Sequence, residues 1–236
     1  MLNSAQEAMK NHRIPLTSIV SRTQDIIDAD AAGDGSIREG ILTVMMRYLD
    51  TDTLLCWAPE QDPDTGMSRE NSATGGEVRR KSLRQLQMET AKPIMAYLTT
   101  NLWPGVKIKP ALDEGSIMPT SQSEMTRSVI SGWIAGLPAY ELAALERAVL
   151  AGKSLLVAAR LLIEWSEEFR DLQKGLGESE EGERNRFGVH EAAEASNVEV
   201  KWQTGMWGEV EDTHDVDHED IRRQLGSAVL LVSGSR

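Results

Sequence analysis

The sequence predicts a mainly α protein. Apolar residues make up 40% of the 236 positions but aromatic residues only 5%, so Leu, Ala and Met carry much of the apolar content. These residue types favour helices over strands. Apolar residues also recur three to four positions apart over long stretches, which is the spacing of one helical face. A chain of this length can form one substantial domain with a real core.

The apolar periodicity places helices in order along the chain. The stripe that begins at Ile37 is wide, and the stretch after Pro138 is apolar over so many turns that it should be buried on much of its circumference. We expect that stretch to be the hub of the fold, interrupted only at Gly152. After Asp52 we expect a short extended, buried segment. The expected helices cover residues 17–28, 37–50, 82–89, 93–101, 123–135, 138–168, 189–202 and 217–232.

Three segments lack helical periodicity. Residues 59–80 contain Pro, Gly and polar residues, and residues 173–186 are rich in Gly and charge, so both are predicted to be mobile insertions. Residues 104–119 are irregular, with a possible short strand at 106–109. We therefore predict a single helical domain over 1–236 that carries two insertions.

Charge and composition exclude several classes of protein. The formal net charge of −12 argues against general binding of nucleic acid or anionic membranes, which needs a surplus of Lys and Arg. No apolar run approaches the ~20 residues of a membrane span. Cys56 is the single cysteine, so an internal disulfide is impossible and a reducing compartment is expected. The first residues have the pattern of neither a signal peptide nor an Arg-rich presequence.

Short motifs that could carry catalysis are incomplete. Gly152-Lys-Ser154 looks like the end of a phosphate-binding loop, but Arg147 stands where that loop needs a glycine, and a helix precedes it instead of a strand. Asp50 and Asp52 could share a cation, but alone they are a weak signal, and capping of a helix end explains the same residues. No catalytic constellation remains, so we expect no enzymatic activity, no cofactor and no metal.

Two histidines near the C-terminus are candidate metal ligands. His214 and His218 lie one helical turn apart and could form half of a zinc site. The glutamate that makes such a helix a protease is missing, and a surface pair near a helix start is the favoured interpretation.

An acidic segment near the C-terminus remains as a candidate binding surface. Eight acidic residues stand against one basic residue, Lys201, between 199 and 220, and Trp202, Met206 and Trp207 lie among them. Aromatic anchors beside carboxylates are typical of a protein interface and its rim. Inward-packed tryptophans with solvated acids would produce the same pattern.

Several strings resemble a known family. Trp207-Gly-Glu-Val-Glu-Asp-Thr-His-Asp215 and the following segment from Asp220 to Leu231 resemble the C-terminal signature of the mitochondrial F(1) ATP synthase assembly factor that chaperones the α subunit. Further matches, in the order of the family, begin at Pro15, Tyr48 and Glu141 and cover nearly all of the chain except its loops.

The resemblance implies a fold and a partner. The fold is a multi-helix orthogonal bundle with little or no sheet, and the N-terminal β domain of the family is expected to be absent. The function implied is to bind unassembled ATP synthase F(1) α subunit in the mitochondrial matrix, as a monomer, and to deliver it to the α/β ring. Motif matching indicates partner contacts at Glu199, then at Glu211, His214, Asp215 and Trp207.

Two alternatives remain open at this point. One is a helical scaffold that presents the same acidic face to a different partner. The other is a metal-dependent hydrolase that uses Asp50, Asp52, His214 and His218.

Overall fold

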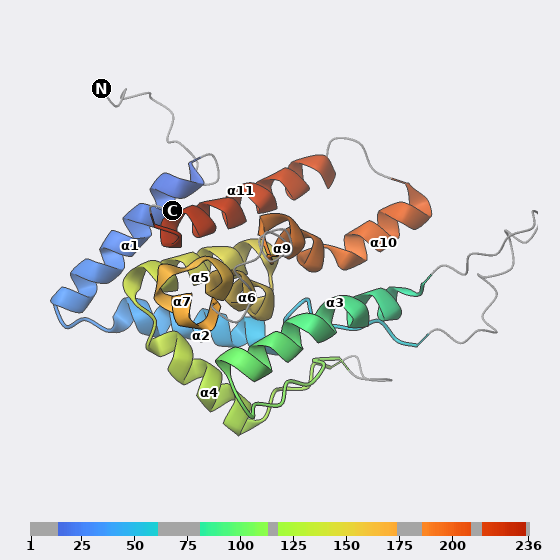
Figure 1. Cartoon of the computed structure of the whole chain (residues 1–236), viewed down its shortest axis with the longest axis horizontal. Helices are drawn as coiled ribbons and strands as arrows, with labels where there is room; N and C mark the ends of the chain where they lie inside the picture. The colour runs from blue at the N-terminus through green and yellow to red at the C-terminus, as the bar shows by residue number, and fades with distance from the viewer. Residues whose placement is uncertain (1–13, 61–80, 113–117, 174–185, 209–213, 235–236) are drawn as a thin grey trace, which may run out of the picture.

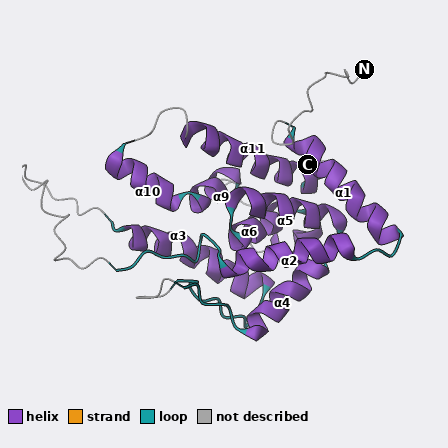
Figure 2. Ribbon diagram, turned by 180° about the vertical axis from the view of Figure 1, so that it is seen from behind, coloured by secondary structure: helices purple, strands orange, loops and turns teal. Residues whose placement is uncertain are grey.

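The computed structural model describes residues 14–60, 81–112, 118–173, 186–208 and 214–234, and within these ranges its regular elements are all helical (Figures 1 and 2). The predicted mainly α fold is therefore confirmed. The two predicted insertions fall largely on 61–80 and 174–185, which lie outside the described residues. None of the described helices has the length and hydropathy needed to cross a membrane.

Helices α1 (Pro15–Ala31), α2 (Ser36–Asp50) and α4 (Glu124–Ala135) confirm three of the predicted helices. Proline suits the first turn of α1 because that turn needs no backbone donor there. Helix α4 begins where the Ser123 side chain accepts a hydrogen bond from Thr126 N. Each helix buries one apolar stripe, which in α2 consists of Ile41, Met45 and Leu49.

The hub of the fold is a pair of helices, α5 (Ala139–Gly152) and α6 (Leu155–Trp165). The prediction of one continuous helix over 138–168 is wrong. Lys153 adopts a left-handed conformation (φ 54°) that ends α5, and the Ser154 side chain then caps α6 by accepting from Val157 N. The first ten residues of α6 are all buried, so the predicted burial of this region is confirmed. In Figure 1 the pair lies at the centre of the molecule, among α1, α2, α9 and α11.

Helix α3 (Leu83–Tyr97) replaces two shorter predicted helices. Pro93 was expected to begin a second helix, but it lies inside α3, which continues for another turn. The helix then widens into a π-helical turn, η2 (Leu98–Leu102). A capping box between Ser82 and Gln85 begins α3.

The two predicted extended segments are also wrong. After Asp52 the chain forms a turn in which Leu54 and Leu55 are buried, with one isolated bridge between Cys56 and Leu112. Residues 106–109 form no strand. Instead the Gln122 side chain accepts from Lys109 N (3.0 Å) and donates to Lys109 O (2.7 Å), so it satisfies the backbone as a neighbouring strand would.

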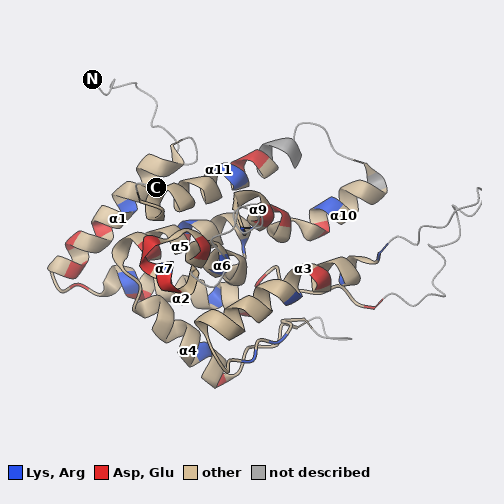
Figure 3. Ribbon diagram, in the orientation of Figure 1, with Lys and Arg blue, Asp and Glu red and all other residues tan. Residues whose placement is uncertain are grey.

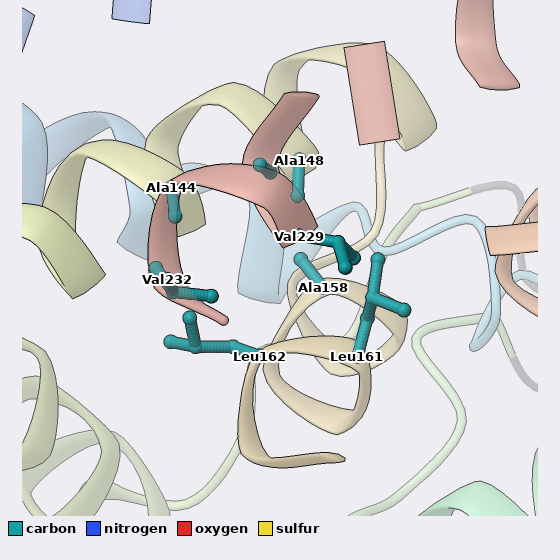
Figure 4. Close-up of a pocket in the computed structure, with 8 residues that line it drawn as sticks. Ala144, Ala148, Ala158, Leu161, Leu162, Val229 and Val232 are labelled. Carbon is teal, nitrogen blue, oxygen red and sulfur yellow. The ribbon is translucent and has the colours of Figure 1, made fainter. Parts of the chain in front are cut away.

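The C-terminal part contains α9 (Val189–Ser196), α10 (Val198–Trp207) and α11 (His214–Val232). The last confirms the predicted final helix, whereas the predicted helix over 189–202 is divided at Asn197. The short elements η3 (Glu167–Phe169) and α7 (Arg170–Gln173) follow α6. Between α5, α6 and α11 a gap of about 10 Å³ is lined by apolar side chains such as Leu161 and Val229 (Figure 4). It is too small and too apolar for a ligand.

Candidate functional site

Helix α10 lies at one end of the molecule, against α3 (Figure 1). None of its described side chains is fully buried, and the apolar side chains of Val200 and Met206 are 40% and 45% exposed. Gly208 ends the helix with φ 87°, a conformation that suits glycine. Figure 3 shows α10 without charge over most of its length. The helix therefore offers partly uncovered apolar surface, which is a feature of protein-binding sites.

Glu199 is on the first turn of α10, and its side chain is exposed. Its Oε1 accepts a hydrogen bond from Gln203 Nε2 of the same helix at 3.0 Å. The carboxylate is thus held by one neighbour and remains accessible to a partner.

The other predicted contact residues are placed only in part. Trp207 ends α10, and His214 and Asp215 begin α11, but the description of these three covers the backbone alone. Glu211 lies outside the described residues. Their role in binding a partner remains a prediction.

Glu194 of α9 ties the base of α10 to α11. Its carboxylate forms an ion pair with Lys201 of α10, and its Oε1 lies 3.5 Å from Nε2 of His218 on α11. Among the described residues no group of three or more His, Cys, Asp or Glu side chains is arranged to hold a metal ion. His218 is placed as part of a helix junction.

The two aspartates of the Leu-Asp-Thr-Asp-Thr string have separate tasks. Asp50 Oδ1 accepts from Arg127 Nη1 at 2.5 Å, which joins α2 to α4. Asp52 is completely buried and accepts from Leu54 N and Leu156 N, each at 3.0 Å. Their expected role as caps is confirmed for Asp52, although the helix that it caps is α6, far along the chain.

A groove of about 770 Å³ runs between α3 on one side and α9 and α10 on the other. It is partly open, and its floor includes the buried side chain of Arg160 from α6. The walls are mainly apolar. They include Leu86, Pro93, Ile94 and Tyr97 from α3, Phe187, and Ala195, Val198 and Trp202 from α9 and α10.

The floor of this groove was missed in the sequence, although one signal was present. Arg160 is the one charged residue in the first nine positions of α6, and a buried charge in such an apolar helix calls for a special environment. Its Nη1 donates to Glu164 Oε2 at 2.5 Å, and Arg186 Nε donates to Glu164 Oε1 at 3.2 Å. One carboxylate therefore lies between two guanidinium groups.

In its described part the protein is all-α, and the half-exposed helix α10 lies beside a groove. Helical proteins bind other polypeptides with surfaces of this type. The comparisons with known proteins agree with this class. Residues 3–99 match the family of the ATP12 chaperone protein. Over 224 residues the chain is 29% identical to the protein atp12, mitochondrial, of Schizosaccharomyces pombe, covering 95% of this chain and 62% of that protein. Over 237 residues the chain is also 29% identical to protein ATP12, mitochondrial, of Saccharomyces cerevisiae, and this match covers 94% of this chain and 65% of that protein.

The match of residues 3–99 to the ATP12 chaperone family and the similarity to these two relatives confirm the recognition made from the motifs. The chain spans a little less than two thirds of the length of these two relatives. Among solved structures, Atp12 from Paracoccus denitrificans has a TM-score of 0.61 at 18% identity, covering 97% of this chain and 76% of that one. The Atu1473 protein from Agrobacterium tumefaciens has a TM-score of 0.56 at 20% identity, covering 92% and 63%. At these identities the likeness concerns the fold.

Proposed function

We propose that this chain is an assembly chaperone that binds the unassembled α subunit of the mitochondrial ATP synthase F(1) sector. It prevents the subunit from aggregating and delivers it to the α/β ring in the mitochondrial matrix. The match of residues 3–99 to the ATP12 chaperone family supports this proposal, as does the similarity to two relatives that are named as mitochondrial proteins.

The observation that carries the proposal is the surface of α10. An exposed carboxylate, Glu199, lies beside the partly exposed apolar side chains of Val200 and Met206 on a helix that the core covers incompletely. Apolar contact can mask an aggregation-prone face of a client, and the carboxylate adds steering and specificity at modest cost in affinity. A modest affinity is useful because the true assembly partner must displace the chaperone.

The proposed mechanism is mass action without chemistry. A chaperone that binds the folded, unassembled client lowers the concentration of free client and so slows its self-association. Neighbouring subunits then compete for the same face and release the chaperone. We expect this activity to need no ATP, so a dependence of client protection on ATP hydrolysis would contradict the mechanism.

The test is a comparison of two charge reversals. Glu199→Lys should reduce capture of isolated F(1) α subunit by at least tenfold in a pull-down and should abolish suppression of light scattering by aggregating α subunit. Asp28→Lys is the matched control. Asp28 is also an exposed carboxylate that accepts a hydrogen bond from a glutamine four residues away, here Gln24 Nε2 at 2.7 Å, but it lies on α1.

The control variant should retain capture within twofold of the unmodified chain. Equal loss in both variants would indicate a general effect of net charge and would contradict a specific role for α10. Retention in both would remove Glu199 from the binding surface.

A further inference from the structure

Arg160 is a charged side chain that is buried next to aromatic rings. The residue is only 8% exposed, and its guanidinium stacks on the ring of Tyr97 at 3.7 Å from the ring centre and lies 5.1 Å from that of Phe187. Burial of a charge is unfavourable unless hydrogen bonds and an opposite charge compensate for it. The stacking and one ion pair with Glu164 supply part of that compensation.

Hydrogen-bond donors of Arg160 remain unused. Among the described residues, Glu164 is the one acceptor that the guanidinium has, and it engages Nη1. The guanidinium has five N–H donors in a planar fork. Nε and Nη2 can therefore still donate hydrogen bonds to a ligand in the groove that Arg160 lines. The hydroxyl of Tyr97 is likewise buried without a hydrogen-bond partner. Burial raises the pKa of Tyr97, so this hydroxyl is neutral and can donate.

The charges at the floor of the groove favour an anionic ligand. Glu164 is 1% exposed and neutralises only one of the two guanidinium groups, Arg160 and Arg186, that contact it. Arg186 Nη2 also donates to the backbone oxygen of Glu164 at 2.9 Å. One positive charge remains among these three groups, in a chain whose formal net charge is −12. The two carboxylates of the groove lining have other partners, since Glu191 accepts from Gly188 N and Glu194 pairs with Lys201. Guanidinium groups bind carboxylates with bidentate geometry.

The walls of the groove favour an apolar body next to that anion. Ile94 and Pro93 of α3 face Val198 and Trp202 of α10 across a volume of about 770 Å³. That volume accommodates several large side chains. The groove is partly open, and α10 forms one wall of it while also carrying the exposed Val200 and Met206. A chain that left the groove could therefore continue over α10, as an extended or helical peptide does.

We propose that the groove between α3 and α9–α10 binds a peptide segment of a partner protein in which a carboxylate adjoins large apolar side chains, with the carboxylate on Arg160. The proposal rests on the proposed function only in identifying that partner as a chaperone client. The apolar side chains occupy the space beside Val198 and Trp202, and the carboxylate completes the hydrogen bonding of the guanidinium.

The experiment uses the full chain and a defined probe. The probe is a fluorescein-labelled peptide, Gly-Ser-Leu-Phe-Glu-Leu-Phe-Ser-Gly, and the comparison peptide has Gln in place of Glu. Fluorescence anisotropy should show the Glu peptide binding at least tenfold more tightly, because a hydrogen-bonded charge pair discriminates by about that factor or more. Arg160→Met should abolish this preference.

Two valine variants keep the test independent of the fold. Val198→Asp places a carboxylate in the groove wall and should weaken binding of the Glu peptide at least tenfold. Val20→Asp introduces the same charge at an exposed valine of α1, away from both α10 and the groove lining, and should change binding less than twofold. These variants decide the matter even if Arg160→Met fails to fold.

Three results would overturn the inference: equal affinity for the two peptides, equal effects of the two valine variants, or displacement of the peptide by decanoate at a similar affinity. The last would assign the groove to a small apolar acid. Capture of the F(1) α subunit is measured separately on the same variants. If peptide binding follows the pattern above while α-subunit capture is absent, the groove is retained and the proposed client fails. If Val198→Asp leaves both α-subunit capture and peptide binding unchanged, the groove fails and the proposed client stands.

Discussion

Asp52 is a buried charge that connects two distant parts of the chain. Its carboxylate accepts backbone hydrogen bonds from Leu54 beside it and from Leu156, 104 residues further along, in the first turn of α6. The positive end of a helix dipole stabilises a carboxylate at this place. Removal from water works in the opposite direction and is the larger effect, so burial raises the pKa of Asp52 to about 6.

This pKa predicts how stability depends on pH. The folded pKa, about 6, exceeds the ordinary value of 3.8, so the folded state binds the proton more tightly than the unfolded state does. The contribution of Asp52 to stability is therefore complete below about pH 4 and is lost as the pH rises through 6. The unfolding free energy of the unmodified chain, minus that of Asp52→Asn, should therefore be larger at pH 4 than at pH 7.5, and we predict that the change is about 2 kcal/mol. Urea unfolding followed by circular dichroism at several pH values measures this difference.

Asp34 provides a control of opposite sign. The backbone N–H of Ser36 donates to its carboxylate and lowers its pKa, so any stability that it contributes is present above the ordinary pKa and lost as the pH falls. Asp34→Asn should thus lose less relative to the unmodified chain at low pH than at neutral pH. A pH-independent difference for Asp52→Asn would show that Asp52 has the same pKa in the folded and unfolded states.

At the scale of elements, local sequence signals were sufficient where a helix has one apolar stripe and clear ends. Helix α4 lies within the predicted range 123–135, and α11 ends at Val232 as predicted. The predictions failed where tertiary contacts override local signals. Pro93 is tolerated inside α3. At the start of α6 the local cap by Ser154 is joined by Asp52, from a distant turn, which accepts a hydrogen bond from Leu156 N. Such partners are not visible in a window of neighbouring residues.

Gly152 also allows close contact between two helices. A Cβ atom at this position would lie 2.7 Å from Ser196 Oγ of α9, closer than van der Waals contact permits. Gly152→Ala should destabilise the fold by about 1 kcal/mol, since overpacking outweighs the gain in helix propensity. In combination with Ser196→Ala the destabilisation should largely disappear, giving a coupling energy of about 1 kcal/mol in a double-mutant cycle measured by urea unfolding.

Gly132 of α4 is the matched control for this cycle. A Cβ atom there meets nothing within 4 Å, so Gly132→Ala should leave stability unchanged or raise it by up to about 1 kcal/mol. Additive effects of Gly152→Ala and Ser196→Ala would contradict the proposed contact.

At the scale of the whole molecule, the sequence indicated the surface of α10 as a candidate site but gave little indication of the groove. Glu199 was selected by motif matching within an acidic segment, and the structure places its side chain at the surface of α10. The groove could not, because Tyr97, Arg160 and Val198 come from three helices separated by long stretches of chain. A lone arginine in an apolar helix predicts that compensating acceptors or aromatic rings lie around it. It does not predict which helices supply them.

The buried side chains of the described helices form one cluster, which includes residues from α1 to α11. Helix α5 is central to it, because α5 packs against α1, α6 and α11. We therefore predict that these helices unfold as one cooperative unit. Leu145→Ala, at a fully buried position of α5, should destabilise the protein by about 2–5 kcal/mol, and helix content and the near-ultraviolet signal of the Trp103–Trp133 pair should be lost together.

The exposed Leu150 on the same helix is the control, since Leu150→Ala should alter stability by no more than about 0.5 kcal/mol. Scanning calorimetry measures both variants, with a van't Hoff enthalpy that equals the calorimetric enthalpy if unfolding is all-or-none. Two separate transitions, of which Leu145→Ala shifts only one, would divide the chain into independent domains. A single transition that shifts as a whole places α10 and its groove on the same folded unit as the core, so a client bound there would stabilise every helix at once.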